Sequence, residues 1–373
     1  MATSDDDAIL RFAVVGTGMM GVEHIRNLKL RPDVQVVALC DPVQKSLEKA
    51  MSVLGEHASR PDCFSDVASL LAARNSGLKV DAVVVASPNH THREVLEPLL
   101  GTGLHILCEK PLATTLDDAR WTADAANVKP RGVFWVGMEY RYMPPVAEFI
   151  ARVKSGAIGE LRMVAIREHR FPFLPKVGDW NRFSRNTGGT MVEKCCHFFD
   201  LMRLIVGAEP VRIFCSGAMD VNHWEERYGG ETPDIIDNSY TIVDFANGVR
   251  GMLDLCMFAE GSQNEQEIAA VGDRAKLEVL IPEGDIVFSP RVGFAAKRVE
   301  REHVEIDQKI LRAGYHCGAT YFQHGALIGA IRGRNTTEVT ANDGLMAVAM
   351  GLAAERSARE KRAIELDTSS ASR

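Results

Sequence analysis

The first third of the chain alternates short hydrophobic runs with stretches in which hydrophobic residues recur every three or four positions. The runs predict β-strands at 11–15, 34–40, 81–86, 104–108 and 132–136, and the stretches between them predict helices at 20–30, 43–54, 66–74, 92–100 and 116–127. Strands that are hydrophobic throughout and separated by helices are typical of a parallel sheet covered on both faces. We therefore predict an α/β domain in this part of the chain.

The pattern changes after about residue 140, where strands follow one another with few helices between them. Helices are predicted at 144–155, 190–206 and 342–361, and strands at 161–170, 211–219, 239–246, 250–258, 267–271 and 276–281. Asn247-Gly248 separates two of the strands and predicts a hairpin turn, because both residues tolerate a positive φ. This half is predicted to be an α+β domain with a mainly antiparallel sheet.

Composition and charge narrow the class of protein. The 373 residues are 46% hydrophobic and 25% charged, which is normal for a chain of two globular domains. The net charge of −7 repels phosphate backbones, so we expect no nucleic-acid partner. No uncharged run of about 18 apolar residues is present, and the acidic start predicts a short disordered tail at 1–9 instead of a signal peptide. We expect no membrane partner and a cytoplasmic location.

The eight cysteines form no C-x-x-C pair, and most of them lie inside hydrophobic, strand-like runs. This usage predicts reduced thiols, as in cytosolic proteins. Cys195-Cys196 is an unusual adjacent pair, but a zinc site would need more ligands at short spacing. We therefore predict no metal site.

A glycine-rich motif lies where the first predicted strand meets the first predicted helix. Gly16-Thr17-Gly18-Met19-Met20-Gly21 follows that strand, and Asp41 ends the second strand 20 residues after Gly21. In such a unit the first glycine permits a tight turn, the second lets the backbone approach a pyrophosphate, and the third lets the helix pack against the strand. The helix N-terminus adds N–H groups and partial positive charge. The motif predicts a Rossmann domain, with a doubly wound parallel sheet, that binds a dinucleotide.

Asp41 and the segment after the strand at 81–86 extend this predicted site. A carboxylate at Asp41 would bind the adenosine ribose and repel the extra phosphate of NADP, which favours NAD, while Lys45 nearby keeps NADP as a second candidate. Asp41-Pro42 also fits a helix N-cap followed by a first-turn proline. At the carboxyl ends of the strands the predicted cofactor contacts are Ser87, Pro88, Asn89 and His92, although this segment also fits a capping cluster for the next helix.

Two further motifs carry groups suited to proton transfer. Glu109-Lys110-Pro111 follows the strand at 104–108, where Lys110 could touch a substrate hydroxyl beside the nicotinamide. Taken alone, Glu109-Lys110 is more often a surface pair. If 190–206 is one helix, Glu193 and His197 share a face. A carboxylate that orients a histidine and raises its basicity is what a general base for alcohol oxidation needs. The alternative is an ordinary pair on a solvated face, but the surrounding hydrophobic residues indicate burial, where an unsatisfied polar pair is costly.

Together these motifs resemble the Gfo/Idh/MocA family of glucose–fructose oxidoreductases and inositol dehydrogenases. The resemblance extends from Phe12 to about Leu366 and includes the glycine motif, Asp41, Ser87-Pro88-Asn89 with His92, Glu109-Lys110-Pro111, and the glycine-rich stretch before Glu193 and His197. Residues 330–334, 342–344 and 353–354 resemble the closing helical region of the family.

The resemblance implies a dinucleotide-binding Rossmann domain at 10–138 and a substrate and oligomerisation domain at 139–373. The large open sheet of the second domain would form a homodimer or homotetramer. The implied reaction is hydride transfer between a nicotinamide cofactor and a hydroxyl or carbonyl of a sugar, an inositol-like polyol or a sugar acid. Lys110, Glu193 and His197 would be catalytic, and Glu109 and Lys110 would also contact the cofactor.

Two positions depart from the family pattern. Members such as inositol dehydrogenase have aspartate where Glu193 stands, and commonly glycine where Cys195 stands. The longer acid would shift His197 by about one methylene, and a misplacement of that order affects rate. We expect the chemistry to be retained while the substrate differs.

The segment 167–185 is predicted to line the substrate pocket. Its basic residues would attract an acidic or phosphorylated sugar, and Trp180 could stack on a sugar face; a solvated loop or a subunit contact fits the segment equally well. The basic residues are Arg167, His169, Arg170, Lys176, Arg182 and Arg185. Arg141, Tyr142 and His316 are further pocket candidates, and the patternless stretch 221–234 is predicted to be a lid or an interface arm.

Two other functional classes remain open on the sequence. A glycosidase that oxidises its substrate transiently with NAD could use the same lysine and histidine, and net NADH formation would separate it from a dehydrogenase. A non-catalytic NAD-binding regulator would need neither Lys110 nor His197, so the presence of both favours an enzyme.

Overall fold

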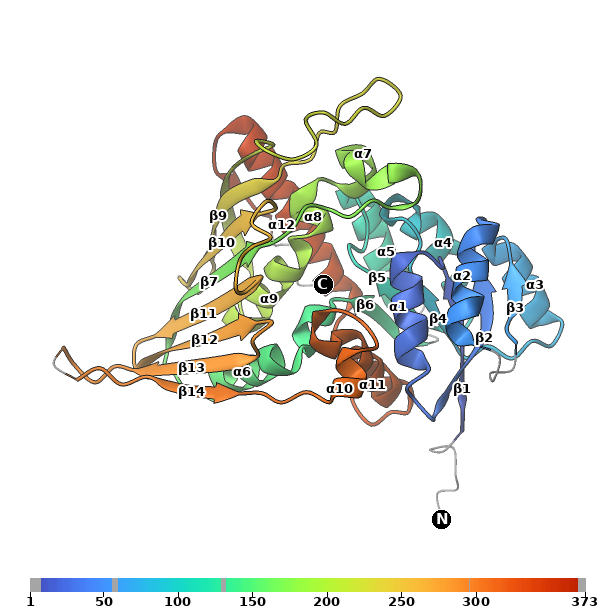
Figure 1. The fold of residues 1–373 in the computed structure, drawn as a ribbon, viewed down its shortest axis with the longest axis horizontal. Coiled ribbons are helices and arrows are strands. Elements are labelled where there is room, and N and C mark those ends of the chain that lie inside the picture. Colours follow the sequence, from blue (N-terminus) through green and yellow to red (C-terminus); the bar gives the residue numbers. More distant parts are fainter. Residues whose placement is uncertain (1–7, 56–59, 129–131, 295, 368–373) are drawn as a thin grey trace, which may run out of the picture. The chain divides into compact units, whose positions relative to one another are not determined.

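The computed structural model describes residues 8–55, 60–128, 132–294 and 296–367, and the chain divides into two compact units (Figure 1). The first unit comprises residues 1–139, 176–178 and 307–345, and the second comprises 140–175, 179–306 and 346–373. Each unit is built around one sheet. Residues 1–7 of the predicted tail lie outside the described residues, and the predicted domain division after residue 138 stays a prediction.

The first unit contains a six-stranded parallel sheet in the order β3-β2-β1-β4-β5-β6. Its centre is fully buried, because the hydrophobic residues of neighbouring strands are covered on both faces. The strand order reverses between β1 and β4, which confirms the predicted doubly wound topology. The strands are β1 (Leu10–Val15), β2 (Val34–Cys40), β3 (Asp62–Phe64), β4 (Ala82–Val85), β5 (His105–Glu109) and β6 (Phe134–Gly137).

The predicted helices of this unit are present, and a later part of the chain adds more. The helices are α1 (Met19–Leu28), α2 (Gln44–Leu54), α3 (Val67–Asn75), α4 (His92–Leu99) and α5 (Leu116–Val128), with a short 3-10 helix η1 (Asn89–Thr91). The segment 307–345 contributes α10 (Gln308–Leu311), η4 (His316–Gly318) and α11 (Ala319–Ile331). Helix α11 packs against α1, so the first unit is assembled from both ends of the chain.

The second unit contains a nine-stranded sheet in the order β14-β13-β12-β11-β7-β10-β9-β8-β15. Among the described residues, β7 and β10 are parallel neighbours and the other pairs are antiparallel, so the predicted mainly antiparallel sheet is confirmed. Gly248, with φ 83°, forms the predicted turn between β9 and β10. The strands are β7 (Leu161–His169), β8 (Pro210–Ala218), β9 (Asn238–Phe245), β10 (Arg250–Cys256), β11 (Gln266–Gly272), β12 (Ala275–Ile281), β13 (Asp285–Pro290), β14 (Glu300–His303) and β15 (Ile364–Glu365).

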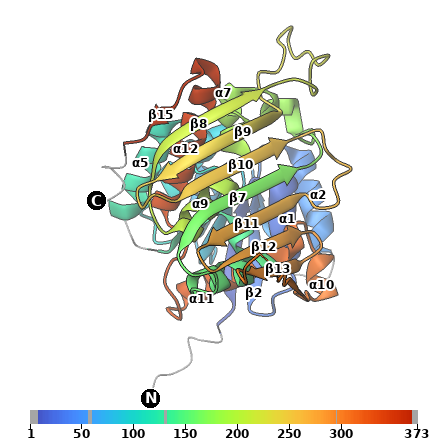
Figure 2. The same cartoon turned by 90° about the vertical axis from the view of Figure 1, so that its left-hand side faces the viewer.

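The two faces of this sheet differ. Helices α6 (Pro144–Lys154) and α9 (Cys196–Val206) pack against one face, while Figure 2 shows the other face of β8, β9, β10, β7 and β11 without a helix over it. Large hydrophobic side chains on that open face are 40–65% exposed, and we call them the outer apolar patch: Met163, Phe214, Tyr240, Ile242 and Met252. Ile242 lies opposite both Phe214 and Met252 in the strand register, so the patch is continuous across β8, β9 and β10.

The predicted single helix at 190–206 is wrong in one respect, because the structure divides it into α8 (Thr190–Glu193) and α9. The N–H groups of Lys194 and Cys195 both bond to the Thr190 carbonyl, and a new helix begins from the Cys195 carbonyl. Glu193 therefore ends one helix while His197 lies in the first turn of the next. The Lys194 ammonium is buried in contact with Tyr140 and Glu168, and such tertiary contacts override local helical periodicity.

The remaining helices include α12 (Ala341–Glu360), close to the predicted closing helix, together with α7 (Ser184–Thr187) and the 3-10 helices η2 (Glu139–Tyr142) and η3 (Val177–Arg182). Within the described part of the chain, no helix is both long and apolar enough to cross a membrane.

Candidate active site

The glycine motif forms a tight turn between β1 and α1. A Cβ atom on Gly16, which has φ 85°, would lie 2.4 Å from the Ser87 nitrogen, and one on Gly21 would lie 2.0 Å from the Gly16 oxygen. Both glycines are therefore required by close backbone packing. At Gly18, by contrast, a Cβ would meet no described atom within 4 Å.

Gly18 leaves open space at the start of α1. Gly18 is the N-cap of α1, and no side chain of the described residues caps this helix, so no capping side chain occupies its first-turn N–H groups. Thr17 is buried and Met19 is exposed at the helix start. The geometry therefore provides the backbone donors that the predicted motif requires, and Gly18 leaves the room that they need.

Asp41 connects the glycine turn to the end of β2. One carboxylate oxygen accepts hydrogen bonds from the Thr17 N–H at 2.7 Å and the Thr17 hydroxyl at 3.1 Å, and the other accepts from the Val43 N–H at 2.8 Å. Helix α2 begins at Gln44 with Val43 as its N-cap, so the alternative interpretation of Asp41 as the helix cap is wrong. Each carboxylate oxygen accepts about two hydrogen bonds, which leaves capacity for a ribose hydroxyl.

The segment after β4 is held by its own polar side chains. The Thr91 hydroxyl lies 2.9 Å from Ser87 Oγ and 2.7 Å from the Pro88 carbonyl, and Asn89 is buried. The buried ring of His92 lies 2.9 Å from the Pro111 carbonyl and 3.1 Å from that of Ser87. Burial lowers the pKa of His92. His92 thus links the segments that follow β4 and β5, and its predicted contact with the cofactor stays a prediction.

Glu109 and Lys110 lie at the end of β5. Glu109 is buried, with one oxygen 2.8 Å from His24 Nε2 on α1 and the other accepting the Lys110 N–H at 3.2 Å. Lys110 itself is half-buried. The surface-pair alternative does not fit Glu109, because its carboxylate points into the unit and fixes the backbone of Lys110.

The second unit holds the predicted base, His197, in a buried aromatic contact. The ring is 2% exposed and stacks on Tyr140, with centroids 4.0 Å apart and planes 6° apart. Tyr140 is fixed in turn by Lys194, whose Nζ lies 2.6 Å from the Tyr140 hydroxyl and 2.8 Å from Glu168 Oε1. Glu193, at the end of α8, is also buried, so the solvated-face alternative is wrong for both Glu193 and His197.

Sequence reasoning missed Tyr140, Lys194 and Glu168. A signal for Glu168 exists in β7, where Val164, Ile166 and Glu168 lie on one buried face and the acid breaks the hydrophobic alternation. A carboxylate with no exposed surface needs a cationic partner, and Lys194 supplies it.

Arg141, predicted to reach the substrate, is engaged by Asp200. Arg141 Nε lies 2.6 Å and Nη2 lies 2.5 Å from the two Asp200 oxygens, and both side chains are buried. Such a two-point pair fixes the guanidinium in one orientation. Tyr142 ends η2, Trp180 lies in η3, and His316 lies in η4 beside Glu139.

The arginines and the histidine of the basic segment 167–185 pair with carboxylates of the second unit. Arg167 and His169 lie in β7, within the strand predicted at 161–170, so the segment is not a loop throughout. Arg167 Nε lies 3.2 Å and His169 Nε2 lies 2.9 Å from the Asp254 carboxylate. Further ion pairs hold Arg182 to Glu226, Arg185 to Glu231 and Arg170 to Glu168. These contacts favour the structural interpretation of the segment over recruitment of an acidic sugar.

The same ion pairs fasten the stretch 221–234. Glu226 and Glu231 both lie in it, and the Asp237 carboxylate accepts the N–H groups of Val221 and Asn222 at 2.8 and 2.6 Å. Two ion pairs therefore hold the stretch to Arg182 and Arg185. Its role as a lid or an interface arm stays a prediction.

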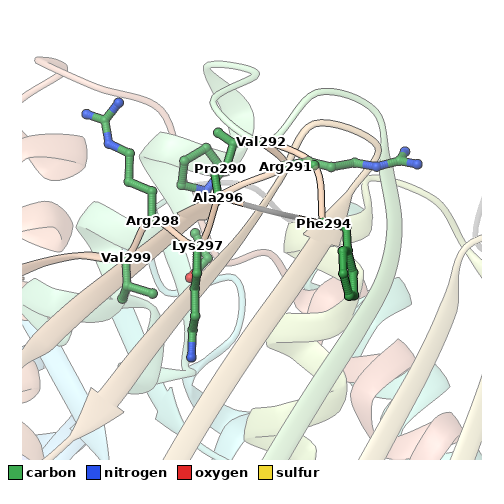
Figure 3. A pocket seen from close by; sticks show the side chains of 10 residues that line it. Pro290, Arg291, Val292, Phe294, Ala296, Lys297, Arg298 and Val299 are labelled. Carbon is green, nitrogen blue, oxygen red and sulfur yellow. The ribbon is translucent and has the colours of Figure 1, made fainter.

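A separate pocket of about 550 Å³ lies in the loop between β13 and β14 (Figure 3). Its lining includes Phe294, whose side chain is fully exposed, and the cations Arg291, Lys297 and Arg298. The lining contains neither a carboxylate nor an imidazole, and none of the predicted site residues.

None of the eight cysteines, all of which lie in the described residues, forms a disulfide. Burial raises the pKa of the Cys195 thiol well above its ordinary value, which keeps it protonated and unreactive.

Comparison with known proteins places this geometry in context. The model of the oxidoreductase family's NAD-binding Rossmann fold matches residues 10–138, and that of its C-terminal alpha/beta domain matches 150–366. The chain is 25% identical to a myo-inositol 2-dehydrogenase of Thermotoga maritima, over 96% of this chain and 99% of that protein. It is 28% identical to a levoglucosan dehydrogenase of Pseudarthrobacter phenanthrenivorans, over 78% of each.

The fold also matches solved structures. A levoglucosan dehydrogenase in complex with NADH superposes with a TM-score of 0.81 at 20% identity, over 96% of this chain and 99% of that one. At this identity the likeness concerns the fold, and it agrees with the two sheets described above.

Proposed function

Since the chain belongs to the Gfo/Idh/MocA oxidoreductase family, we propose that it transfers a hydride between NAD(H) and a hydroxyl or carbonyl carbon of a sugar or polyol. The observation that carries the proposal is the glycine turn, where Gly18 leaves open space beside the uncapped N-terminus of α1. The relatives named as inositol and levoglucosan dehydrogenases support the substrate class.

The residues of the first unit would hold the cofactor through its phosphates and ribose. The first-turn N–H groups of α1 would bind the pyrophosphate, and Asp41 would bind the adenosine ribose and disfavour the additional phosphate of NADP. The nicotinamide supplies the hydride acceptor or donor of the reaction. NAD is therefore the proposed cofactor and NADP the weaker alternative.

Proton transfer is assigned to side chains of the chain itself. We assign His197 as the base that takes the proton of the substrate hydroxyl, and Lys110 as the cation that stabilises the developing alkoxide. The Tyr140 ring, stacked on His197, fixes the plane of the imidazole, and the Lys194–Glu168 pair fixes Tyr140. Glu193 keeps its predicted role as the carboxylate that orients His197.

A neutral sugar or polyol fits the second unit better than a sugar acid. The guanidinium groups of Arg141, Arg182 and Arg185 are all engaged by carboxylates of the same unit. A carboxylate substrate would have to compete with those ion pairs, whereas hydroxyl groups require only hydrogen bonds.

The outer apolar patch supports the predicted homo-oligomer. Monomeric proteins rarely expose contiguous apolar side chains over several strands, and such surfaces typically mark protein interfaces. We propose that a second copy of the chain covers this face as a homodimer or homotetramer.

The test is to mix purified protein with NAD, and separately with NADP, against inositols, neutral sugars and sugar acids, and to follow the absorbance of the reduced nicotinamide. Net NADH formation with a neutral polyol or sugar is expected. Tight NAD binding without net reduction on any member of the panel would overturn the dehydrogenase assignment, and chromogenic glycosides would then separate a glycosidase from a regulator.

A further inference from the structure

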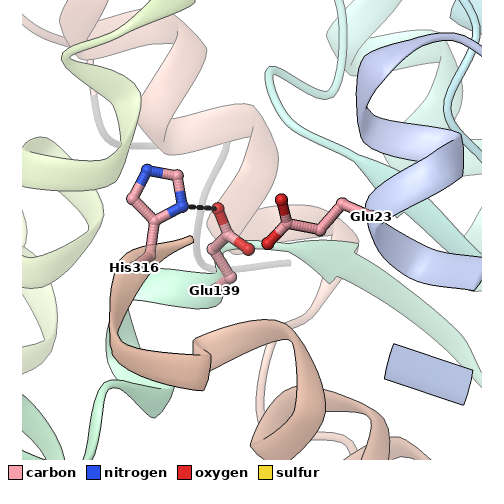
Figure 4. Close-up of side chains that lie close together, drawn as sticks. All are labelled: Glu23, Glu139 and His316. Atoms are coloured by element: carbon pink, nitrogen blue, oxygen red, sulfur yellow. Dashed lines mark ion pairs between the residues drawn. The ribbon is translucent and has the colours of Figure 1, made fainter. Parts of the chain in front are cut away.

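A compact group of metal-ligating side chains lies in the first unit, formed by Glu23, Glu139 and His316. They come from α1, the start of η2 and η4, which are far apart in the sequence. One donor atom from each lies within 4.8 Å of the other two, and Figure 4 shows the three side chains converging. Both glutamates are 1% exposed, and the His316 side chain is 25% exposed.

Each carboxylate has one oxygen that accepts a hydrogen bond from a neighbouring residue of the first unit. Glu23 Oε1 accepts the Tyr315 N–H at 2.9 Å, while Glu23 Oε2 is buried and has no hydrogen-bond partner among the described residues. Glu139 Oε2 accepts the Thr320 hydroxyl at 2.7 Å, while Glu139 Oε1 lies 3.0 Å from His316 Nδ1. Outer hydrogen bonds that orient the ligands are characteristic of protein metal sites.

The charge of the group calls for a cation. Two buried carboxylates face each other, and a single imidazole stands beside one of them. Burial and the charge of Glu139 raise the pKa of Glu23. Despite its burial, the charge and hydrogen bond of His316 lower the pKa of Glu139 to about 2. A cation between the two buried carboxylates would compensate their negative charge.

We propose that Glu23, Glu139 and His316 bind a divalent cation, Zn²⁺ or Mn²⁺. Two carboxylates with one imidazole suit these ions, whereas Mg²⁺ and Ca²⁺ prefer ligand sets made of oxygen alone. The sequence predicted no metal because its ligands share no short spacing motif. The site does not depend on the proposed dehydrogenase activity, since none of its ligands is assigned to that reaction.

A cation here would join α1, which follows the glycine turn, to the start of η2 and to the returning segment 307–345. The expected role is structural, because the metal would bridge three segments of one unit that the sequence keeps apart. Metal binding of this kind adds to folding stability, since the unfolded chain has no preformed site.

The test uses the full-length protein, stripped with a chelator and dialysed, without NAD. Calorimetric titration with Zn²⁺ and with Mn²⁺ is expected to show one site in the wild type. At about 100-fold excess over Kd the melting temperature should rise by about 5 °C. Co²⁺ should give visible absorption of a bound ion that Zn²⁺ displaces.

Two variants separate this site from adventitious binding. Glu23→Gln keeps the side-chain shape and removes the charge, so it should lower the affinity for the cation at least tenfold. The metal-free variant should keep the fold and the NAD affinity of the wild type. Asp285→Asn removes the carboxylate of an exposed pair, in which Asp285 Oδ1 lies 2.8 Å from His303 Nδ1, and should leave binding unchanged. Equal affinity in the wild type and Glu23→Gln, or no wild-type site for either cation, would overturn the proposal and leave a shared proton between the glutamates.

If Glu23→Gln fails to fold, His316→Asn is the second test, because it removes the imidazole at the more exposed side of the group. This variant should also bind Zn²⁺ and Mn²⁺ at least tenfold more weakly than the wild type. Unchanged affinity in this folded variant would be equally decisive against the site.

Discussion

At the scale of single residues, the Tyr140 ring holds His197 in place. The stack on Tyr140 fixes the imidazole plane, and the division between α8 and α9 separates Glu193 from the helix that carries His197. A base whose ring is fixed in this way needs little reorganisation before it accepts a proton.

His197→Ala should therefore lower turnover about 10²- to 10⁴-fold, because the general base is lost. The affinity for NAD should stay at the wild-type value, since the proposed cofactor contacts belong to other residues. Steady-state rates and NAD titration check both expectations. His303→Ala, at an exposed histidine on β14, serves as the control, and wild-type turnover in His197→Ala would remove His197 from the mechanism.

Glu355 supplies a pH dependence of stability. Burial raises the pKa of this carboxyl from 4.5 to about 7, and one of its oxygens accepts the Met191 N–H at 2.9 Å. The folded protein thus holds a proton that the unfolded chain releases near pH 4.5, so stability falls as pH rises from about 4.5 to about 7. The full effect is about 3 kcal/mol.

The Gln side chain of Glu355→Gln cannot ionise. The free energy of unfolding of the variant, relative to that of the wild type, should therefore increase between pH 5 and pH 8 by up to about 3 kcal/mol. Urea denaturation of both proteins at several pH values measures the difference, which also cancels other titrating groups. A difference that is constant with pH would show that Glu355 does not titrate in this range.

At the scale of elements, the turn between β1 and α1 gives a matched pair of glycine substitutions. Gly18→Ala places its methyl group in open space, whereas Gly21→Ala places it 2.0 Å from a backbone oxygen. Gly18→Ala should keep the wild-type melting temperature and lose NAD affinity, because the methyl occupies the pyrophosphate space. Gly21→Ala should lose both folding stability and NAD affinity. The loss of stability should exceed about 1 kcal/mol, which is the order of magnitude expected for overpacking.

Thermal melts and NAD titration of the two variants distinguish the roles of the glycines. If Gly18→Ala bound NAD as the wild type does, the open space would not be the phosphate site. If both variants melted early, Gly18 would also be required for packing.

The elements that sequence could predict are those with a clear hydrophobic period. The strands at 34–40 and 250–258 and the helix at 144–155 were found to within two residues, since burial alone determines them. Strand β14 was missed because its four residues, Glu-Arg-Glu-His, are all exposed and carry no hydrophobic signal. Helix α11 was missed because its apolar residues are distributed all around the helix, so the sequence shows no amphipathic periodicity.

The site was predictable where one short segment contains the signal, as in the glycine motif. It was not predictable where distant segments converge. Tyr140, Lys194 and Glu168 meet only in the folded unit, and so do Glu23, Glu139 and His316. The charge balance of segment 167–185 also depends on acids distant in sequence, such as Asp254 and Glu231.

At the scale of the whole molecule, the outer apolar patch is where another chain is expected to bind. Ile242→Lys places a charge between Phe214 and Met252, so it should shift the protein to a smaller assembly. Sedimentation or light scattering with size exclusion measures the change. Val128→Lys, at a residue 78% exposed on α5, is the matched control. An unchanged mass for Ile242→Lys would exclude this face as the interface.

The return of segment 307–345 to the first unit has a consequence for synthesis on the ribosome. Helix α1 is made early, but its partner α11 emerges about 290 residues later, which at about 5–20 residues per second is a wait of roughly 15–60 s. During that interval the face of α1 that α11 will cover stands in water. It carries Glu23, His24 and Asn27, and α11 brings Thr320, Gln323 and His324. Polar groups are well hydrated during that interval. The nascent Rossmann part can therefore remain incomplete without exposing an aggregation-prone hydrophobic surface there.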